Sequence, residues 1–151
     1  MADFIQPSRI ALQVELDSPE AAIQFGGNLL EASDLITQAY TQAMLDRYHK
    51  QGPYFVIAPG IAFPHARPEE GALATGFSLV TFKTPIVFSH PSNDPVHLML
   101  CLSATDSQKH LEALMRLAEL LQSEALKQKW FQANDKETIL ADLNDLGGYD
   151  L

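Results

Sequence analysis

The sequence predicts an α/β domain in which a small mixed β-sheet is flanked by helices on both faces. Short runs rich in β-branched, aromatic and aliphatic residues, bounded by proline and glycine, have the composition of strands, and other segments repeat apolar residues at helical spacing. Residues 96–102 are apolar at nearly every position, which indicates a central strand covered on both faces. The 151 residues are enough for one core, and we expect residues 1–151 to form a single domain.

The first expected elements are two amphipathic helices. Ser18 and Pro19 predict a helix start, because serine caps the free N–H groups of the first turn and proline fits the first helical position. Ser33 or Asp34 can cap a second helix that runs to about residue 50. Strands are then expected at residues 54–57, 77–82 and 96–102.

The remainder of the chain is expected to be helical. One helix begins after Asp106, and Asp135 can cap a final helix through Leu143. Residues 147–151 are expected to form a loose tail. The apolar residues that recur at helical spacing after Asp106 are Leu111, Leu114, Met115, Ala118 and Leu121.

Composition and charge exclude several classes of function. The formal net charge of −9 leaves no basic stripe for a phosphate backbone, so nucleic acid is not an expected partner. The chain has no signal sequence at its start and no apolar run of membrane-spanning length, so we expect a cytoplasmic protein. The single cysteine, Cys101, excludes an internal disulfide, and its apolar neighbours predict a small buried hydrophobe.

Three histidines have ordinary interpretations. His49 falls in a predicted helix, His90 in a Ser-His-Pro loop and His97 in a predicted strand, and none has the close spacing of metal ligands. Asp94, before Pro95, fits turn chemistry. Because no glycine-rich phosphate loop is present either, no metal and no cofactor is expected.

The strongest functional signal lies in residues 58–68, where three prolines and a glycine surround His65. Such a backbone fixes the direction of the imidazole, and a neutral imidazole is a competent nucleophile near pH 7. On residue types alone, an ordinary turn that contains a histidine is the favoured interpretation.

This segment resembles the mannitol/fructose-type enzyme IIA family of the bacterial sugar phosphotransferase system, whose hallmark is a Gly-x-Ala-x-Pro-His loop. Residues 76–80 and 106–111 extend the resemblance, and residues 56–68 are most similar to the ascorbate-specific branch. The resemblance implies a sheet flanked by helices and a phosphohistidine at His65, formed from phospho-HPr. It also implies transfer to a cysteine of an enzyme IIB that works with a membrane enzyme IIC, the component that selects the sugar.

The resemblance further implies a role for His110, in the first turn of the helix after Asp106. Helix N-termini favour anions, and the spacing to Leu114, Leu117 and Leu121 places His110 beside the apolar ridge. A phosphoryl-stabilising donor is the interpretation that the resemblance favours. A core histidine with a satisfied N–H is the alternative.

The family uses an arginine before the histidine loop to stabilise the phosphoryl group, and Arg47 is the candidate here. It follows Tyr40, Ala43 and Met44 at helical spacing, and its guanidinium suits phosphate oxygens. The alternative is a side chain that extends to solvent at a helix C-terminus. Arg67, two residues after His65, is a reserve candidate.

Two other functions compete with the phosphoryl carrier. One is a regulatory enzyme IIA-like module that binds target proteins according to its phosphorylation state, and the other is a binding protein whose histidine loop is never phosphorylated. The joint presence of His65 and His110 argues against the second. The sequence indicates no oligomeric state.

Overall fold

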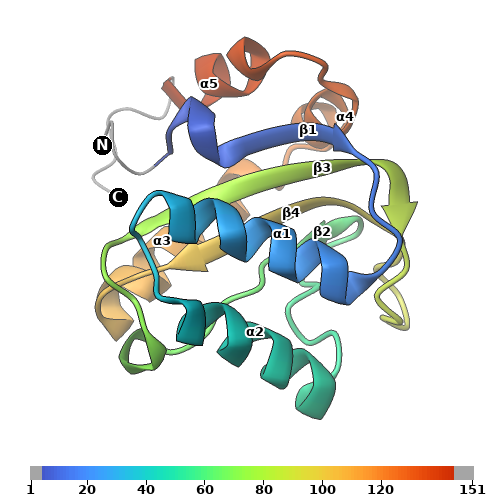
Figure 1. The fold of residues 1–151 in the computed structure, drawn as a ribbon. Coiled ribbons are helices and arrows are strands. Elements are labelled where there is room, and N and C mark those ends of the chain that lie inside the picture. The colour runs from blue at the N-terminus through green and yellow to red at the C-terminus, as the bar shows by residue number, and fades with distance from the viewer. Residues whose placement is uncertain (1–4, 145–151) are drawn as a thin grey trace.

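The computed structural model describes residues 5–144, apart from the side chains of residues 109, 110, 113, 114 and 144. It contains a four-stranded mixed sheet with helices on both faces, which confirms the predicted fold class (Figure 1). The strand order is β1-β3-β4-β2, with β1 parallel to β3, β3 antiparallel to β4, and β4 parallel to β2. The strands are β1 (Ile10–Val14), β2 (Ile61–Ala62), β3 (Gly76–Ile86) and β4 (Val96–Ser103).

Helices α1 (Pro19–Ala32) and α2 (Gln38–Gln51) lie on one side of the sheet. Helices α3 (Ser107–Leu120), α4 (Glu124–Gln132) and α5 (Lys136–Asn144) lie on the other. No helix in the described part of the chain is both long enough and apolar enough to cross a membrane. The expected tail, residues 147–151, lies outside the described residues.

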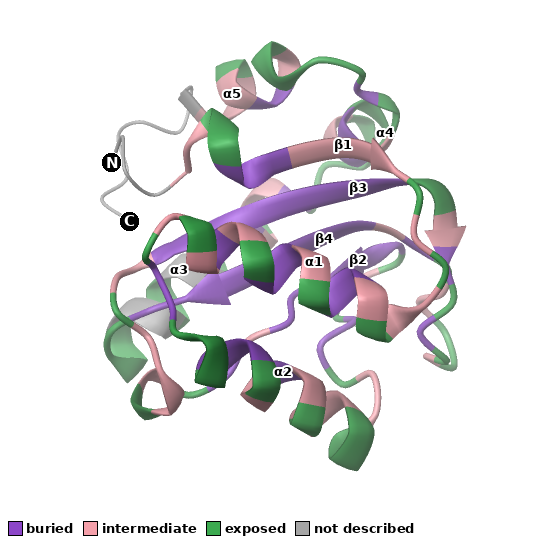
Figure 2. Ribbon diagram, viewed as in Figure 1, coloured by how far each residue is buried: buried purple, intermediate pink, exposed green. Residues whose placement is uncertain are grey.

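Successive side chains of the central strands point to opposite faces of the sheet, and each face has its own hydrophobic core. Val80 and Met99 pack with the buried residues of α1 and α2, whereas Leu79 and Leu100 pack with those of α3, α4 and α5. Both central strands are therefore buried along most of their length, as Figure 2 shows. The apolar composition of residues 96–102 has this cause, and the prediction of a central strand there is confirmed.

Two of the predicted helix starts are confirmed by their capping hydrogen bonds. The Ala21 amide donates to the Ser18 hydroxyl at 3.1 Å, which begins α1. The Thr138 amide donates to the Asp135 carboxylate at 3.0 Å, which begins α5. Both side chains satisfy amides that a first helical turn leaves without intrahelical partners.

The predicted cap of the second helix was wrong. Ser33 ends α1, and its amide donates to the carbonyl oxygen of Leu30 at 3.2 Å. Asp34 has a φ of +59°, which lies outside the helical region. The chain therefore turns before α2, and Thr37 is the residue that precedes that helix.

The predicted strand at residues 54–57 was also wrong. The Val56 amide donates to the carbonyl oxygen of Pro53 at 3.0 Å, so this segment forms a turn. Phe55 and Val56 are apolar because they fill the core beneath α2. The strand of this region is β2, five residues after Val56. Neither β1 nor α4 was anticipated from the sequence.

Candidate active site

His65 lies where β2 continues alongside the carboxyl end of β4. Ile61 pairs with Leu98 in the β2–β4 ladder, and an isolated bridge pairs His65 with Leu102 in the same register. The Leu102 amide donates to the carbonyl oxygen of Pro64 at 3.0 Å and ties the loop to the strand. The backbone of the sheet therefore sets the position of the imidazole.

The ring of His65 is oriented by its own loop. Its Nδ1 lies 2.7 Å from the carbonyl oxygen of Phe63. A carbonyl oxygen can only accept, so Nδ1 carries the proton and Nε2 is the unprotonated nitrogen of the neutral ring. The carbonyl oxygen of Phe63 is thus the acceptor for the ring N–H.

The surroundings of His65 keep its imidazole neutral. Burial lowers the pKa of His65 below its ordinary value, and the charge of Arg47 lowers it further, while the hydrogen bond to Phe63 acts in the opposite direction. Tyr54 contributes to the enclosure, with its ring edge-on to the imidazole and the two centroids 5.9 Å apart. A half-buried neutral imidazole with a fixed tautomer has the properties of a nucleophile.

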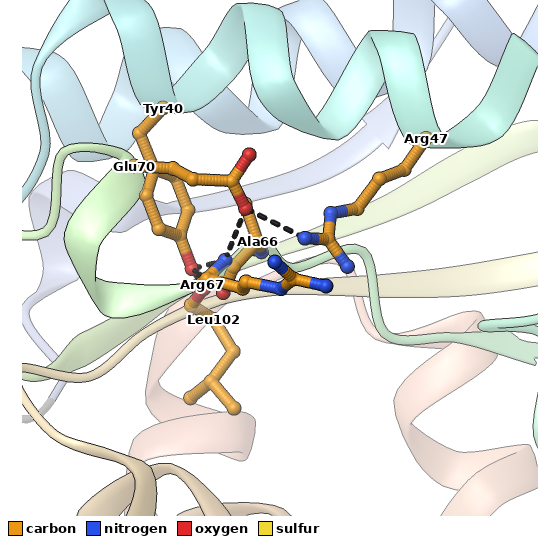
Figure 3. Close-up of polar contacts among 6 residues, drawn as sticks. All are labelled: Tyr40, Arg47, Ala66, Arg67, Glu70 and Leu102. Carbon is orange, nitrogen blue, oxygen red and sulfur yellow. Dashed lines mark hydrogen bonds and ion pairs between the residues drawn. The ribbon is translucent and has the colours of Figure 1, made fainter. Parts of the chain in front are cut away.

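The hydroxyl of Tyr40 fixes the residue that follows His65. This fully buried side chain rises from α2, and its hydroxyl donates to the carbonyl oxygen of Leu102 at 2.6 Å (Figure 3). The same hydroxyl accepts a hydrogen bond from the Ala66 amide at 3.1 Å. Burial raises the pKa of Tyr40, so the hydroxyl keeps its proton at all ordinary pH values.

Arg47 extends from the last turns of α2 toward the same loop. Its Nη2 lies 2.7 Å from Oε1 of Glu70, which stands at the end of the short 3₁₀ helix η2 (Pro68–Glu70). Burial lowers the pKa of Arg47, but the carboxylate of Glu70 outweighs this effect and the net direction is upward. Arg47 is therefore held by a carboxylate partner, and its role toward a phosphoryl group stays a prediction.

A hollow of about 280 Å³ joins these groups to helix α3. Among the described residues that line it, Arg47 and Arg67 are the charged ones, and both are cationic. Ser107, the first residue of α3, lines it as well, so the positive end of that helix is directed to the same space. His65 thus faces a hollow whose described charges favour an anion.

Position 110 lies in the first turn of α3, as the sequence predicts for His110. Its side chain lies outside the described residues. The next side chain, Leu111, lines the hollow with 58% of its surface exposed.

The cysteine and two other histidines lie outside the lining of the hollow and have structural surroundings of their own. Cys101 is fully buried, and burial raises the pKa of its thiol to about 12, so the predicted buried hydrophobe is confirmed. His97 stacks on Phe131 with centroids 4.7 Å apart. His90 accepts hydrogen bonds from backbone amides within its own turn, and Asp94 does the same.

Three residues of the site were missed from the sequence: Tyr40, Tyr54 and Glu70. Tyr40 has the spacing of a core residue, which it also is. Glu70 follows three residues after Arg67, and its spacing to the amide of that residue is the one sequence signal that could have revealed it.

Comparisons with known proteins give a consistent result. A family model described as "Phosphoenolpyruvate-dependent sugar phosphotransferase system, EIIA 2" matches residues 3–145. The ascorbate-specific PTS system EIIA component of Salmonella choleraesuis (strain SC-B67) is 47% identical over 117 residues, which are 77% of this chain and 76% of that protein. The protein of the same description from Escherichia coli (strain K12) is 47% identical over 116 residues, or 76% of this chain and 75% of that protein.

Solved structures resemble the fold along nearly its whole length. The mannitol-specific cryptic phosphotransferase enzyme IIA CmtB of Escherichia coli is 34% identical, with a TM-score of 0.82 over 93% of this chain and 95% of that one. The mannitol enzyme IIA of Escherichia coli, solved in complex with phosphorylated enzyme IIB, has a TM-score of 0.84 at 23% identity, over 93% of this chain and 97% of that one. At that identity the likeness is one of fold.

Proposed function

Since the chain belongs to the type 2 enzyme IIA family of the phosphoenolpyruvate-dependent sugar phosphotransferase system, and is thus a phosphotransferase component, we propose that its phosphoryl carrier is Nε2 of His65. The observation that carries the proposal is the 2.7 Å contact between Nδ1 and the Phe63 carbonyl oxygen, because it leaves the in-plane lone pair on Nε2. The lowered pKa of His65 keeps that lone pair unprotonated near pH 7.

The proposed reaction moves a phosphoryl group between two imidazoles. Nε2 of His65 attacks the phosphorus of phospho-HPr in line, a P–N bond forms on His65, and the donor P–N bond breaks with its electron pair returning to the donor nitrogen. Each ring keeps its one N–H, so no proton is transferred, and the hydrogen bond to Phe63 shares the positive charge that develops on His65. Phosphoryl transfer of this kind depends on positioning and charge stabilisation.

The groups around the hollow would stabilise the transferred group. A phosphoryl group carries a charge of about −2 at neutral pH, and Arg47, Arg67 and the N-terminus of α3 supply positive potential at the same hollow. We assign His110, in the first turn of α3, the role of a phosphoryl-stabilising donor, and Arg47 the same role from α2. Arg67 remains the reserve candidate.

The onward step would deliver the group to a cysteine thiolate of an enzyme IIB, with a P–S bond formed and the electron pair returned to Nε2. A mannitol enzyme IIA with the same fold as this chain has been solved in complex with phosphorylated enzyme IIB. The partner surface would include three exposed apolar side chains. Leu111 lines the hollow and is 58% exposed, Tyr54 lies against the ring of His65 and is 38% exposed, and Met115 follows Leu111 by one turn of α3 and is 60% exposed.

We further propose that residues 1–151 act as one enzyme IIA domain in the cytoplasm and serve uptake of L-ascorbate or a related sugar through a membrane enzyme IIC. The support is the 47% identity to ascorbate-specific components. A regulatory module would form the same phosphohistidine. Growth on ascorbate after deletion of the gene separates the two roles: lost growth supports transport, and unchanged growth favours regulation.

The test of the carrier role is intact mass after incubation with enzyme I, HPr and phosphoenolpyruvate at neutral or alkaline pH, which preserves a phosphoramidate. Wild type should gain one phosphoryl group and His65→Ala none. His49→Gln is the matched control, because His49 is an exposed histidine 3.5 Å from Glu20 and away from the hollow. Absence of the added mass on wild type would overturn the proposal.

A further inference from the structure

Glu70 holds the guanidinium of Arg47 in a position that the proposed phosphoryl group would compete for. One oxygen, Oε1, accepts from Arg47 Nη2 at 2.7 Å and from the Arg67 amide at 2.8 Å (Figure 3). The amide belongs to the residue two positions after His65, so the carboxylate links α2 directly to the histidine loop. Burial raises the pKa of Glu70, but these two contacts outweigh it and the net direction is downward.

The resting position leaves Arg47 incompletely satisfied. Glu70 takes one N–H of the guanidinium, while Nε is buried and has no acceptor among the described residues. A buried N–H without an acceptor is unfavourable, so an additional anion in the adjacent hollow would attract this side chain. Glu70 thus holds Arg47 in the unphosphorylated protein, and a stronger acceptor in the hollow can replace Glu70 as its partner.

We propose that Glu70 is a positioning residue that competes with the phosphoryl group for Arg47 and so limits how strongly the phosphohistidine is stabilised. The inference rests on the proposed function of His65. A carrier that binds its phosphoryl group too tightly passes it on poorly, because an interaction that stabilises the phosphorylated state more than the transition state raises the barrier to onward transfer. Arg47 must break its ion pair with Glu70 before it can bind the phosphoryl group. The free energy of breaking that pair reduces the net stabilisation that Arg47 gives to the phosphohistidine.

The competition predicts a shift in the phosphoryl-transfer equilibrium with HPr. Glu70→Gln keeps an amide oxygen for the Arg67 amide and removes the charge that holds Arg47. The ion pair is partly exposed, at 21% for Arg47 and 33% for Glu70. We therefore expect the equilibrium to move toward the phosphorylated protein by about two- to five-fold, with slower discharge to enzyme IIB.

The matched control is Glu69→Gln, which removes an exposed carboxylate from the same short helix. It should leave the equilibrium unchanged. In an Arg47→Gln background, Glu70→Gln should have no further effect, because the residue it acts through is absent. An equal shift in both backgrounds, or a shift toward the unphosphorylated protein, would overturn the inference.

A second measurement needs no variant. Carboxyl NMR of wild type should give a Glu70 pKa that rises on phosphorylation of His65, because Arg47 leaves the carboxylate. An unchanged or lower Glu70 pKa in the phosphorylated protein contradicts the competition. If wild type takes up no phosphoryl group at all, the proposed function fails and this inference fails with it, whereas normal labelling without these shifts overturns the inference alone.

Discussion

The hydroxyl of Tyr40 donates a 2.6 Å hydrogen bond to the carbonyl oxygen of Leu102, 62 residues later in the chain. It also accepts from the amide of Ala66, the neighbour of His65. One buried oxygen on α2 therefore connects the end of a central strand to the histidine loop. The packing of α2 on the sheet therefore helps to set the position of the His65 imidazole.

Tyr40→Phe should weaken both the fold and the phosphorylation of His65. The change leaves the Leu102 carbonyl and the Ala66 amide buried without this partner, and we expect a loss of about 1–3 kcal/mol in the free energy of unfolding. Urea denaturation measures that loss, and the initial rate of labelling by phospho-HPr at a temperature where the variant is folded measures the positioning effect.

Tyr48→Phe is the control for Tyr40. It removes a hydroxyl that bonds to the Phe88 carbonyl at 3.2 Å and does not touch the histidine loop. Its labelling rate should equal that of wild type. If Tyr40→Phe also labels at the wild-type rate despite its lower stability, the hydroxyl supports the fold alone.

The pKa of His65 should lie below the usual histidine value. Burial and the charge of Arg47 both lower the pKa, so phosphoryl acceptance should persist at pH values below the ordinary histidine pKa of 6.5. Two-dimensional NMR of the ring carbons measures the titration of His65. Arg47→Gln should raise the pKa of His65, and a wild-type midpoint at or above 6.5 would contradict the burial argument.

The same shift affects stability with a definite sign. Below the unfolded value of about 6.5, the unfolded chain binds a proton at His65 that the folded chain does not. Stability is therefore lost as the pH falls from that value toward the folded pKa, and it is unaffected above it. His65→Gln should remove this part of the pH dependence of urea unfolding.

Gly60→Ala should disturb the histidine loop. Gly60 has a φ of +80°, and a Cβ there would lie 3.1 Å from Cζ of Phe131 and 3.3 Å from Cδ2 of His97. A strained residue of this kind costs about 1–3 kcal/mol. Thermal unfolding should show the loss, and the labelling rate of His65 should fall as well.

Gly52→Ala separates these two effects. Gly52 also has a positive φ, +75°, but a Cβ there would meet nothing within 4 Å. It should lower stability and leave the labelling rate close to wild type. A wild-type labelling rate in Gly60→Ala would mean that the loop absorbs the added methyl group.

Cys101 should resist thiol reagents in the folded protein. Its side chain is fully buried, and the pKa of its thiol is raised to about 12, so almost no thiolate exists at pH 8. An aromatic disulfide reagent should react within minutes only after denaturant is added. Fast stoichiometric reaction under native conditions would contradict the described burial.

The parts of the fold that were predictable are those whose cause is local. Ser18 caps α1 through a residue three positions away, and the strand at residues 96–102 is apolar because both of its faces are covered. Strand β1 was missed because it is an edge strand with four half-buried residues, and a φ of +55° at Gln13 interrupts its pairing. Its pattern therefore lacks a clear strand signal.

The residue pattern alone points to one segment of the candidate site, and Arg47 and His110 entered the prediction through the family resemblance. His65 and the prolines around it form a continuous pattern, whereas Glu70 pairs with Arg47 across 23 residues and Tyr40 bonds to Leu102 across 62. Such contacts depend on the packing of α2 over the sheet. The periodicity of apolar residues predicts that Tyr40 is buried, but it does not predict which carbonyl oxygen its hydroxyl will contact.

The register between β2 and β4 limits how the loop can change in length. Ile61 pairs with Leu98 and His65 with Leu102, so three residues lie between the two pairs on each side. Side chains alternate between the faces of a sheet, and a single inserted or deleted residue between Ile61 and His65 would send the imidazole to the opposite face. Natural insertions in related proteins should therefore lie outside residues 61–65, because one added residue there would redirect the imidazole of the proposed phosphoryl carrier.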